Sequence, residues 1–133
     1  MTFVWRDYQN IAKHLNSVAL APGCVNVEAA HRSSVSRHYY AMYHTASNYA
    51  VAKLGYVLPS TNIRHKSLKD FYLNYPDDKV RGISYKFLRD VGADLRSCLS
   101  LRVKADYHSS FNKAGRLNSQ VAMRVERVLV LIS

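Results

Sequence analysis

Two arginine–histidine pairs are the residues of this sequence whose types and spacing could catalyse a reaction. Arg37 and His44 have six residues between them, and Arg102 and His108 have five. A histidine near its ordinary pKa of roughly 6.5 can accept a proton from a 2′-hydroxyl or return one to a leaving 5′-oxygen. An arginine can bind the phosphate bidentately and stabilise the charge that develops on it. The pairs therefore predict cleavage of RNA without a metal, which would leave a 2′,3′-cyclic phosphate end.

Each pair also has an interpretation without catalysis. Arg37 and His44 could form the polar edge of a helix beside its aromatic residues, and Arg102 and His108 could be a basic helix end that interacts with the helix dipole. On a straight helix Arg102 and His108 would lie on different sides, because they are six positions apart. They converge only if the helix ends or bends around Asp106.

Several other classes of site are missing from the sequence. It contains no phosphate-binding G-x-x-x-x-G-K-[ST], no G-x-G-x-x-G and no G-x-S-x-G. The histidines never fall at H-E-x-x-H spacing, and neither cysteine forms a metal-binding pattern with one of them. Asp90 and Asp94 lie four residues apart, which is more typical of a solvated helix face than of a metal site. We therefore expect neither a metal nor another cofactor.

The charge of the chain favours a polyanionic partner. The 133 residues carry 19 Lys and Arg against 9 Asp and Glu, a formal charge of +10. Residues 1–63 contribute +3 and residues 64–133 contribute +7, so the excess is larger in the C-terminal half. Such an excess suits nucleic acid better than a membrane surface, although a soluble basic protein with no such partner is the alternative.

The cellular compartment is predicted from three features. Cys24 and Cys98, the two cysteines, are interpreted as reduced thiols of a cytosolic protein, with a single disulfide as the alternative. No apolar run approaches the roughly 18 residues of a transmembrane helix. The start of the sequence lacks the basic and then apolar layout of a signal peptide. We therefore expect a cytoplasmic protein.

Hydrophobic periodicity predicts an all-α fold, an up-and-down bundle of four to five helices in a single domain over residues 1–133. The expected helices run from Thr2 to about Leu20, from Val27 or Glu28 to about Leu54, from Lys66 to Leu73, from Lys79 to about Leu101, and from Asn118 or Ser119 onward. Gly55 is the expected residue after the C-cap of the second helix. Gly82 and Gly92 are expected to weaken the fourth helix locally.

The predicted helices also have predicted inner faces. In the second, Tyr39, Tyr43, Ala46 and Ala50 form one buried face, whereas Arg37, Tyr40 and His44 form a second stripe. The residues expected inside the first helix are Val4, Tyr8, Ile11, Leu15 and Val18. Those expected inside the fourth are Ile83, Phe87, Val91, Leu95 and Cys98, and those expected inside the fifth are Val121, Val125, Val128 and Leu129.

Two segments resemble one known family. Residues 32–46, RSSVSRHYYAMYHTA, resemble the R-(S/A)-x-x-S-R-x-Y-Y-A-x-(F/Y)-H-x-A helix of HEPN domains (higher eukaryotes and prokaryotes nucleotide-binding). Residues 101–107, LRVKADY, resemble the L-R-x-x-A-D-Y segment that follows the fourth helix in the same group. The resemblance covers roughly residues 5–130 and is more specific for fold than for activity.

The resemblance implies a helical bundle that dimerises and, in many members, a ribonuclease with an R-x4-6-H motif in a cleft shared by both protomers. Arg102 and His108 fall where that motif lies, whereas Val103 departs from the polar residue that often follows the arginine. The pair Arg37 and His44 satisfies the motif on the earlier helix. Other members are catalytically silent partners of small nucleotidyltransferases or bind nucleotides, and toxins and phage-defence effectors occur among them.

These observations lead to one leading hypothesis and two rivals. The leading hypothesis is a dimeric, metal-independent endoribonuclease of the HEPN type, with a toxin or phage-defence effector as its expected role. Arg102 and His108 are the first choice for catalysis, with Arg37 and His44 supporting or replacing them. Lys104, Tyr40 and Tyr107 are candidates for contacting RNA, and Tyr107 could instead simply pack. The first rival is a non-catalytic subunit that binds a nucleotide or a nucleotidyltransferase antitoxin. The second is a helical dimerisation or adaptor module.

Overall fold

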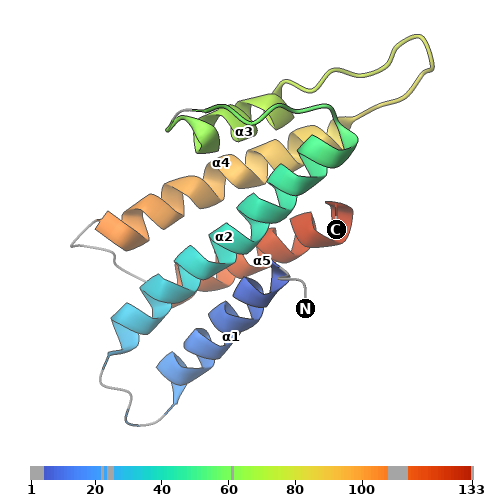
Figure 1. Ribbon diagram of the computed structural model, residues 1–133. Helices are drawn as coiled ribbons and strands as arrows, with labels where there is room; N and C mark the ends of the chain where they lie inside the picture. Colours follow the sequence, from blue (N-terminus) through green and yellow to red (C-terminus); the bar gives the residue numbers. More distant parts are fainter. Residues whose placement is uncertain (1–4, 22, 24–25, 61, 108–113, 133) are drawn as a thin grey trace.

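The fold is a bundle of five α-helices, which confirms the predicted all-α class (Figure 1). The structure is a computed structural model that describes residues 5–21, 23, 26–60, 62–107 and 114–132. The helices are α1 (Arg6–Leu20), α2 (Val27–Lys53), α3 (Arg64–Leu73), α4 (Lys86–Tyr107) and α5 (Ala114–Ile132). Within the described ranges no β-strand forms, and the one isolated antiparallel bridge there joins Asp78 to Ile83.

The longest helix, α2, is the centre of the bundle. It packs against α1, α4 and α5, while α3 packs on the outer side of α4 (Figure 1). Its predicted inner face is confirmed, because Tyr39, Tyr43, Ala46 and Ala50 are all buried. The alanines let neighbouring helices approach closely, and the tyrosines fill the space between them. Gly55 has a φ of 72°, the left-handed conformation expected directly after the helix C-cap.

The second half of the core comes from α4 and α5. Their predicted inner residues Val91, Leu95, Cys98, Val121, Val125, Val128 and Leu129 are buried. Asp94 lies among them with only 2% of its side chain exposed, and it accepts hydrogen bonds from Arg124 and Arg127 of α5. This buried carboxylate therefore ties α4 to α5 through two guanidinium groups.

The predicted inner face of α1 is wrong in part. Ile11 and Val18 are 46% and 39% exposed, whereas Gln9, Ala12 and Ala19 are buried in their place. The helix is rotated because polar contacts with other helices fix its inner side. Gln9 donates a hydrogen bond to Glu126 of α5, and Ser34 of α2 donates one to the carbonyl of Ala12 at 2.7 Å. Val4, the other predicted core residue at this end, lies outside the described residues.

The start and end of the fourth helix also differ from the prediction of Lys79 to about Leu101. Residues 78–83 instead form a turn in which the backbones of Asp78 and Ile83 exchange two hydrogen bonds, and Gly82 has a φ of 67°. Ile83, predicted to be in the core, is 39% exposed in this turn. At its other end α4 continues six residues past Leu101 to Tyr107.

Three further predicted helix starts need correction. The first helix begins at Arg6, and its predicted cap Thr2 lies outside the described residues. The third begins at Arg64 instead of Lys66, and the fifth at Ala114 instead of Asn118 or Ser119. Asn118 is not a cap because it is buried inside α5, where its side-chain oxygen lies 3.0 Å from Ser34 Oγ and its amide nitrogen donates to Asn16 at 2.8 Å.

Candidate functional site

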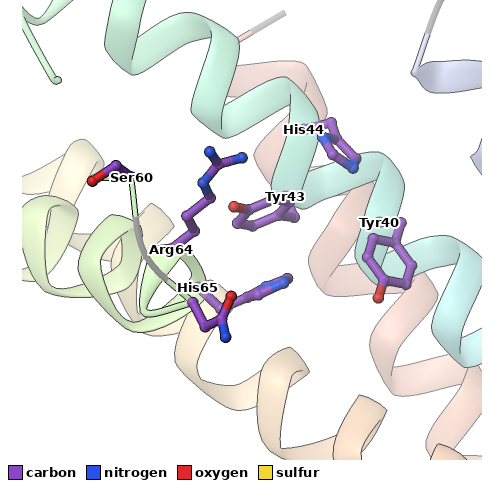
Figure 2. Close-up of a pocket in the computed structure, with 7 residues that line it drawn as sticks. Tyr40, Tyr43, His44, Ser60, Arg64 and His65 are labelled. Carbon is purple, nitrogen blue, oxygen red and sulfur yellow. The ribbon is translucent and has the colours of Figure 1, made fainter. Parts of the chain in front are cut away.

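The candidate site is a cleft of about 430 Å³ between α2 and the start of α3, which we call the histidine cleft. Figure 2 shows Tyr40, Tyr43 and His44 extending from α2 on one side, and Arg64 and His65 extending from α3 on the other. Its lining residues are Tyr40, Tyr43, His44, Ser60, Asn62, Arg64 and His65. The cleft therefore combines two imidazoles, two phenols, a guanidinium group and two small neutral polar groups.

Local sequence explains how these side chains reach one place. Tyr43 and His44 lie three and four positions after Tyr40 on α2, so both extend from the same side of that helix as Tyr40 does. Arg64 and His65 are the first two residues of α3, so they lie at the helix end that the connecting segment brings back toward α2. Arg64 Nε donates to the carbonyl of Pro59 at 3.0 Å, and Tyr56 Oη bonds Ser67 Oγ at 2.8 Å. These contacts anchor the segment before α3 on the rim of the cleft.

The His65 imidazole is held by two tyrosines. Its Nδ1 lies 2.6 Å from Tyr39 Oη, and its ring stacks on Tyr43 with the centroids 4.1 Å apart. Burial raises the pKa of Tyr39, so this residue stays a neutral phenol that can donate to the Nδ1 of neutral His65. In that tautomer the imidazole proton is on Nε2. When His65 is protonated, both ring nitrogens carry a proton, Nδ1–H donates to Tyr39 instead, and the Nε2 proton is the one that can be given to a substrate.

The His44 imidazole is held by two rings of α2 and by the ring of Trp5. The ring of Trp5, just before α1, stacks on it with centroids 3.6 Å apart and planes 14° apart. Tyr43 meets it edge-on at 5.0 Å, and Tyr40 lies nearly parallel at 6.0 Å. The orientation of His44 is therefore set by aromatic contacts.

Both imidazoles favour the neutral form. Burial lowers the pKa of His44, and the nearby charge on His65 lowers it further. Burial also lowers the pKa of His65, with the positive charge of Arg102 as the second cause. The prediction of a histidine near its ordinary pKa therefore does not describe these two residues. Each stays a proton acceptor to a lower pH than an exposed imidazole would.

Arg102 lies behind Tyr40, on the α4 side of the cleft. Its Nη2 donates to Tyr40 Oη at 2.7 Å, and its guanidinium carbon is 5.3 Å from the centre of the same ring. Its Nε forms an ion pair of 3.0 Å with Asp106, one turn along α4. Tyr107 is 73% exposed and so does not pack in the core; its ring lies 5.9 Å from the Arg102 guanidinium carbon. The fold thus brings together four of the predicted site residues, Tyr40, His44, Arg102 and Tyr107.

The other predicted site residues do not line the cleft. Arg37 is exposed and lies over the ring of Tyr8 on α1, with its guanidinium carbon 5.3 Å from the ring centre. Lys104 is exposed on α4 and is not a lining residue. His108 lies outside the described residues, directly after the last residue of α4. The helix continues past Asp106, which instead pairs with Arg102.

Sequence reasoning missed His65, Arg64, Tyr43 and Asn62 as site residues. Tyr43 lies on α2 beside His44 and was predicted only for the core, whereas Asn62, Arg64 and His65 reach the cleft from α3 or from the segment before it. The available signal was the polar stretch Ser60 to His65, which ends in adjacent Arg64 and His65 at the start of a helix. The distance between that stretch and His44 in space depends on how α3 packs.

The described residues form neither a cluster that could hold a metal ion nor a helix that could cross a membrane. Within the described ranges, no group of three or more His, Cys, Asp or Glu side chains is placed to hold a metal ion. In the same part of the chain, none of the helices combines the length and the apolar character needed to cross a bilayer. The side chains that line the histidine cleft include two imidazoles beside the Arg64 guanidinium group, and imidazoles can transfer protons.

Comparisons of this chain with protein-family models, with curated proteins and with solved structures find no match.

Proposed function

We propose that this protein is a metal-independent endoribonuclease that cleaves RNA in the histidine cleft. The observation that carries the proposal is the pair of imidazoles, His44 of α2 and His65 of α3, on one cleft beside the Arg64 guanidinium. Two imidazoles can serve as the base and the acid of one reaction, and a cation beside them can hold the phosphate between them. The formal charge of +10 favours the polyanion that this chemistry needs.

The reaction can be written with these groups. Neutral His44 takes the proton of a 2′-hydroxyl, and the 2′-oxygen attacks the adjacent phosphorus. The bond from phosphorus to the 5′-oxygen breaks, and that oxygen receives the Nε2 proton of protonated His65. A bound phosphate favours the protonated state of His65, since an anion next to an imidazole raises its pKa. The products are a 2′,3′-cyclic phosphate and a 5′-hydroxyl.

Arg64 and Arg102 have different parts in this proposal. Arg64 is on the rim, so it can bind a phosphate oxygen directly. Arg102 acts through Tyr40: because Tyr40 Oη accepts from Arg102 Nη2, its own O–H proton is available for a phosphate oxygen. The HEPN resemblance supports a role for Arg102 and pairs it with His108, whereas the cleft chemistry proposed here assigns the two proton transfers to His44 and His65.

The experiment is an RNA cleavage assay in EDTA. Wild-type protein should cleave single-stranded RNA and leave cyclic phosphate ends, and a substrate with a 2′-deoxy residue at the cleavage position should resist. His44→Gln and His65→Gln should each lower the rate by on the order of 100-fold or more. His14→Gln, at an exposed position of α1, is the matched control and should cleave like wild type. Cleavage that survives in the His44→Gln/His65→Gln double variant, or that EDTA abolishes, would refute the proposal.

A second candidate function is nucleotide binding without cleavage. The specific observation in its favour is the ion pair between Arg102 and Asp106, which neutralises a cation that catalysis could use. The rings of Tyr40 and Tyr43 could then stack on a purine base. Saturable binding of a purine nucleotide by protein that leaves RNA intact would favour this candidate.

The remaining expectations come from the HEPN resemblance, except the cytoplasmic location, which was predicted from the cysteines and from the lack of transmembrane and signal-peptide patterns. They are an HEPN-type fold, a homodimer with a shared cleft, a cytoplasmic toxin or phage-defence effector, and a nucleotidyltransferase antitoxin as partner. We keep them as proposals beside the cleft chemistry, and none of the cleavage assays above depends on them.

A further inference from the structure

Trp5 is in close contact with one of the two imidazoles of the histidine cleft. Its ring and that of His44 are nearly parallel, 3.6 Å apart between centroids. Trp5 directly precedes α1, and its carbonyl accepts a hydrogen bond of 3.0 Å from the backbone N–H of Tyr8. The Tyr8 ring also stacks on the Trp5 ring, with the centroids 5.5 Å apart. The start of α1 therefore fixes the indole against α2.

This contact determines which part of His44 remains accessible. A stacked indole covers a whole face of an imidazole and excludes water from it. Both nitrogens lie in the plane of the ring, so covering a face leaves the nitrogen-bearing edge as the part that can reach a substrate. Since His44 also lines the histidine cleft, that edge belongs to the side where a phosphate would bind.

We infer that Trp5 is a positioning residue for His44. The indole of Trp5 stacks on the imidazole, holds the nitrogen-bearing edge of the imidazole toward the histidine cleft and shields the stacked face from water. The catalytic consequence rests on the proposed ribonuclease function, whereas the stacking itself does not. Burial is the largest cause of the lowered pKa of His44, and the indole is the closest ring that buries it. Removal of the indole should therefore raise the pKa of His44.

Other titratable and charged groups lie around His44 and must be held constant in a test. Its own helix contributes Tyr40 and Tyr43, α3 contributes His65 and Arg64, and α4 contributes Arg102 behind Tyr40. On the α1 side the titratable neighbour is Tyr8, which stacks on Trp5. A single substitution at Trp5 leaves all of them in the protein.

The first experiment uses the fluorescence of the protein, because Trp5 is its one tryptophan. A protonated imidazole stacked on an indole quenches its emission by accepting an electron from the excited ring. On acidification the emission of the wild type should therefore fall with a midpoint below the ordinary histidine pKa. In His44→Gln that transition should disappear, whereas in His14→Gln it should remain. A transition that is identical in wild type and His44→Gln would overturn the inference without any substitution at Trp5.

The second experiment compares Trp5→Ala with Trp5→Phe. NMR titration of the His44 ring should give a pKa closer to the ordinary value in Trp5→Ala and a smaller rise in Trp5→Phe, which keeps an aromatic ring. In the cleavage assay, Trp5→Ala should lower kcat by on the order of 10- to 100-fold with less effect on KM. The acidic limb of the pH–rate profile of Trp5→Ala should also move to higher pH. Trp5→Phe should recover most of the wild-type kcat and most of the wild-type pH profile.

The outcomes separate this inference from the proposed function. If wild-type protein cleaves RNA and Trp5→Ala changes neither the pKa of His44 nor the pH profile, the positioning role is wrong and the ribonuclease remains. If Trp5→Ala raises the pKa of His44 but the wild type cleaves no RNA, the stacking role stands and the proposed function fails. Should Trp5→Ala not fold, the wild-type fluorescence titration and Trp5→Phe still decide the question.

Discussion

At the scale of single residues, the ionisation of His44 and His65 is coupled because both face the same cleft. The charge on His65 lowers the pKa of His44, and that of Arg102 lowers the pKa of His65. An acid–base pair works best when one member is neutral and the other protonated. Since both pKa values are lowered in the free enzyme, the pH optimum of kcat/KM should lie below the ordinary histidine pKa of roughly 6.5.

The coupling predicts the effect of two substitutions on the pKa values. His65→Gln removes a charge that disfavours protonated His44, so the pKa of His44 should rise. Arg102→Gln should likewise raise the pKa of His65. Both rises should be partial, because burial is the larger cause and remains in each variant. NMR titration of the histidine ring protons measures both values, and an unchanged or lower pKa in either variant would contradict the prediction.

A third histidine, His38, predicts how stability depends on pH. It is buried on α2, and burial, with a smaller effect of Lys13 and an opposing effect of Glu126, lowers its pKa to about 4. As the pH falls, His38 binds a proton near pH 6.5 in the unfolded state but only near pH 4 in the folded state. The folded state therefore loses stability as the pH falls from about 6.5 to about 4. The loss attributable to His38 should reach about 3 kcal/mol by pH 4.

Urea unfolding at pH 7 and pH 4.5 tests this prediction. Between pH 7 and pH 4.5 the free energy of unfolding should fall less in His38→Leu than in the wild type, because leucine binds no proton. His14→Gln, at the exposed position on α1, should keep the wild-type loss. Equal losses in the wild type and His38→Leu would show that another group is responsible.

At the scale of the elements, the position of α3 decides whether His65 reaches the cleft. This helix packs on α4, and its last residues, Tyr72 and Leu73, lie directly against Gly92. A Cβ atom at that position would lie 2.6 Å from the backbone nitrogen of Leu73 and 2.9 Å from its Cγ. Gly92 is therefore not only a weak point of α4, as the sequence suggested, but also the surface that allows α3 to come this near.

Gly92→Ala should consequently destabilise the protein. Alanine improves helix propensity by about 1 kcal/mol, but the clash involves backbone and overpacking costs about 1–3 kcal/mol or more. We expect a net loss of about 1–2 kcal/mol in urea unfolding and slower RNA cleavage, since α3 carries Arg64 and His65. Ser100→Ala, at an exposed position of the same helix, should be neutral or slightly stabilising. A higher free energy of unfolding in Gly92→Ala would contradict this prediction, because it would mean that α3 can move away from α4 without cost.

At the scale of the whole molecule, the formal charge of +10 should make RNA binding depend on salt. For a single strand, the logarithm of the binding constant falls by about 0.7 per phosphate contact for each tenfold increase in salt. Arg64→Gln removes a cation from the rim and should lower that slope by about 0.7. Arg81, 77% exposed in the turn that projects between α3 and α4, supplies the matched control (Figure 1).

Binding of a 2′-O-methyl RNA, which cannot be cleaved by 2′-hydroxyl attack, gives the measurement. The wild type and Arg81→Gln should show the same slope, and Arg64→Gln a lower one. Equal slopes in all three proteins would mean that Arg64 makes no phosphate contact. Because no cleavage is needed, this result is independent of the histidine variants.

The sequence determined the features that depend on local periodicity and composition. The buried face of α2 from Tyr39 to Ala50, the apolar faces of α4 and α5, and the glycine after α2 follow from residue spacing and backbone freedom, and all three were predicted. So were two of the three residues of α2 that line the cleft, Tyr40 and His44, whereas the third, Tyr43, was predicted only for the core. Hydrophobic burial and helix geometry act within one helix, and a single sequence displays them directly.

Only the tertiary structure decided which groups from different helices meet. The rotation of α1 depends on Gln9 and Glu126, which are 117 residues apart, and the placement of His65 depends on the close approach of α3 to α4 at Gly92. The stack of Trp5 on His44 depends in turn on how α1 lies against α2. These contacts form between side chains distant in sequence, and no spacing rule within one helix predicts them.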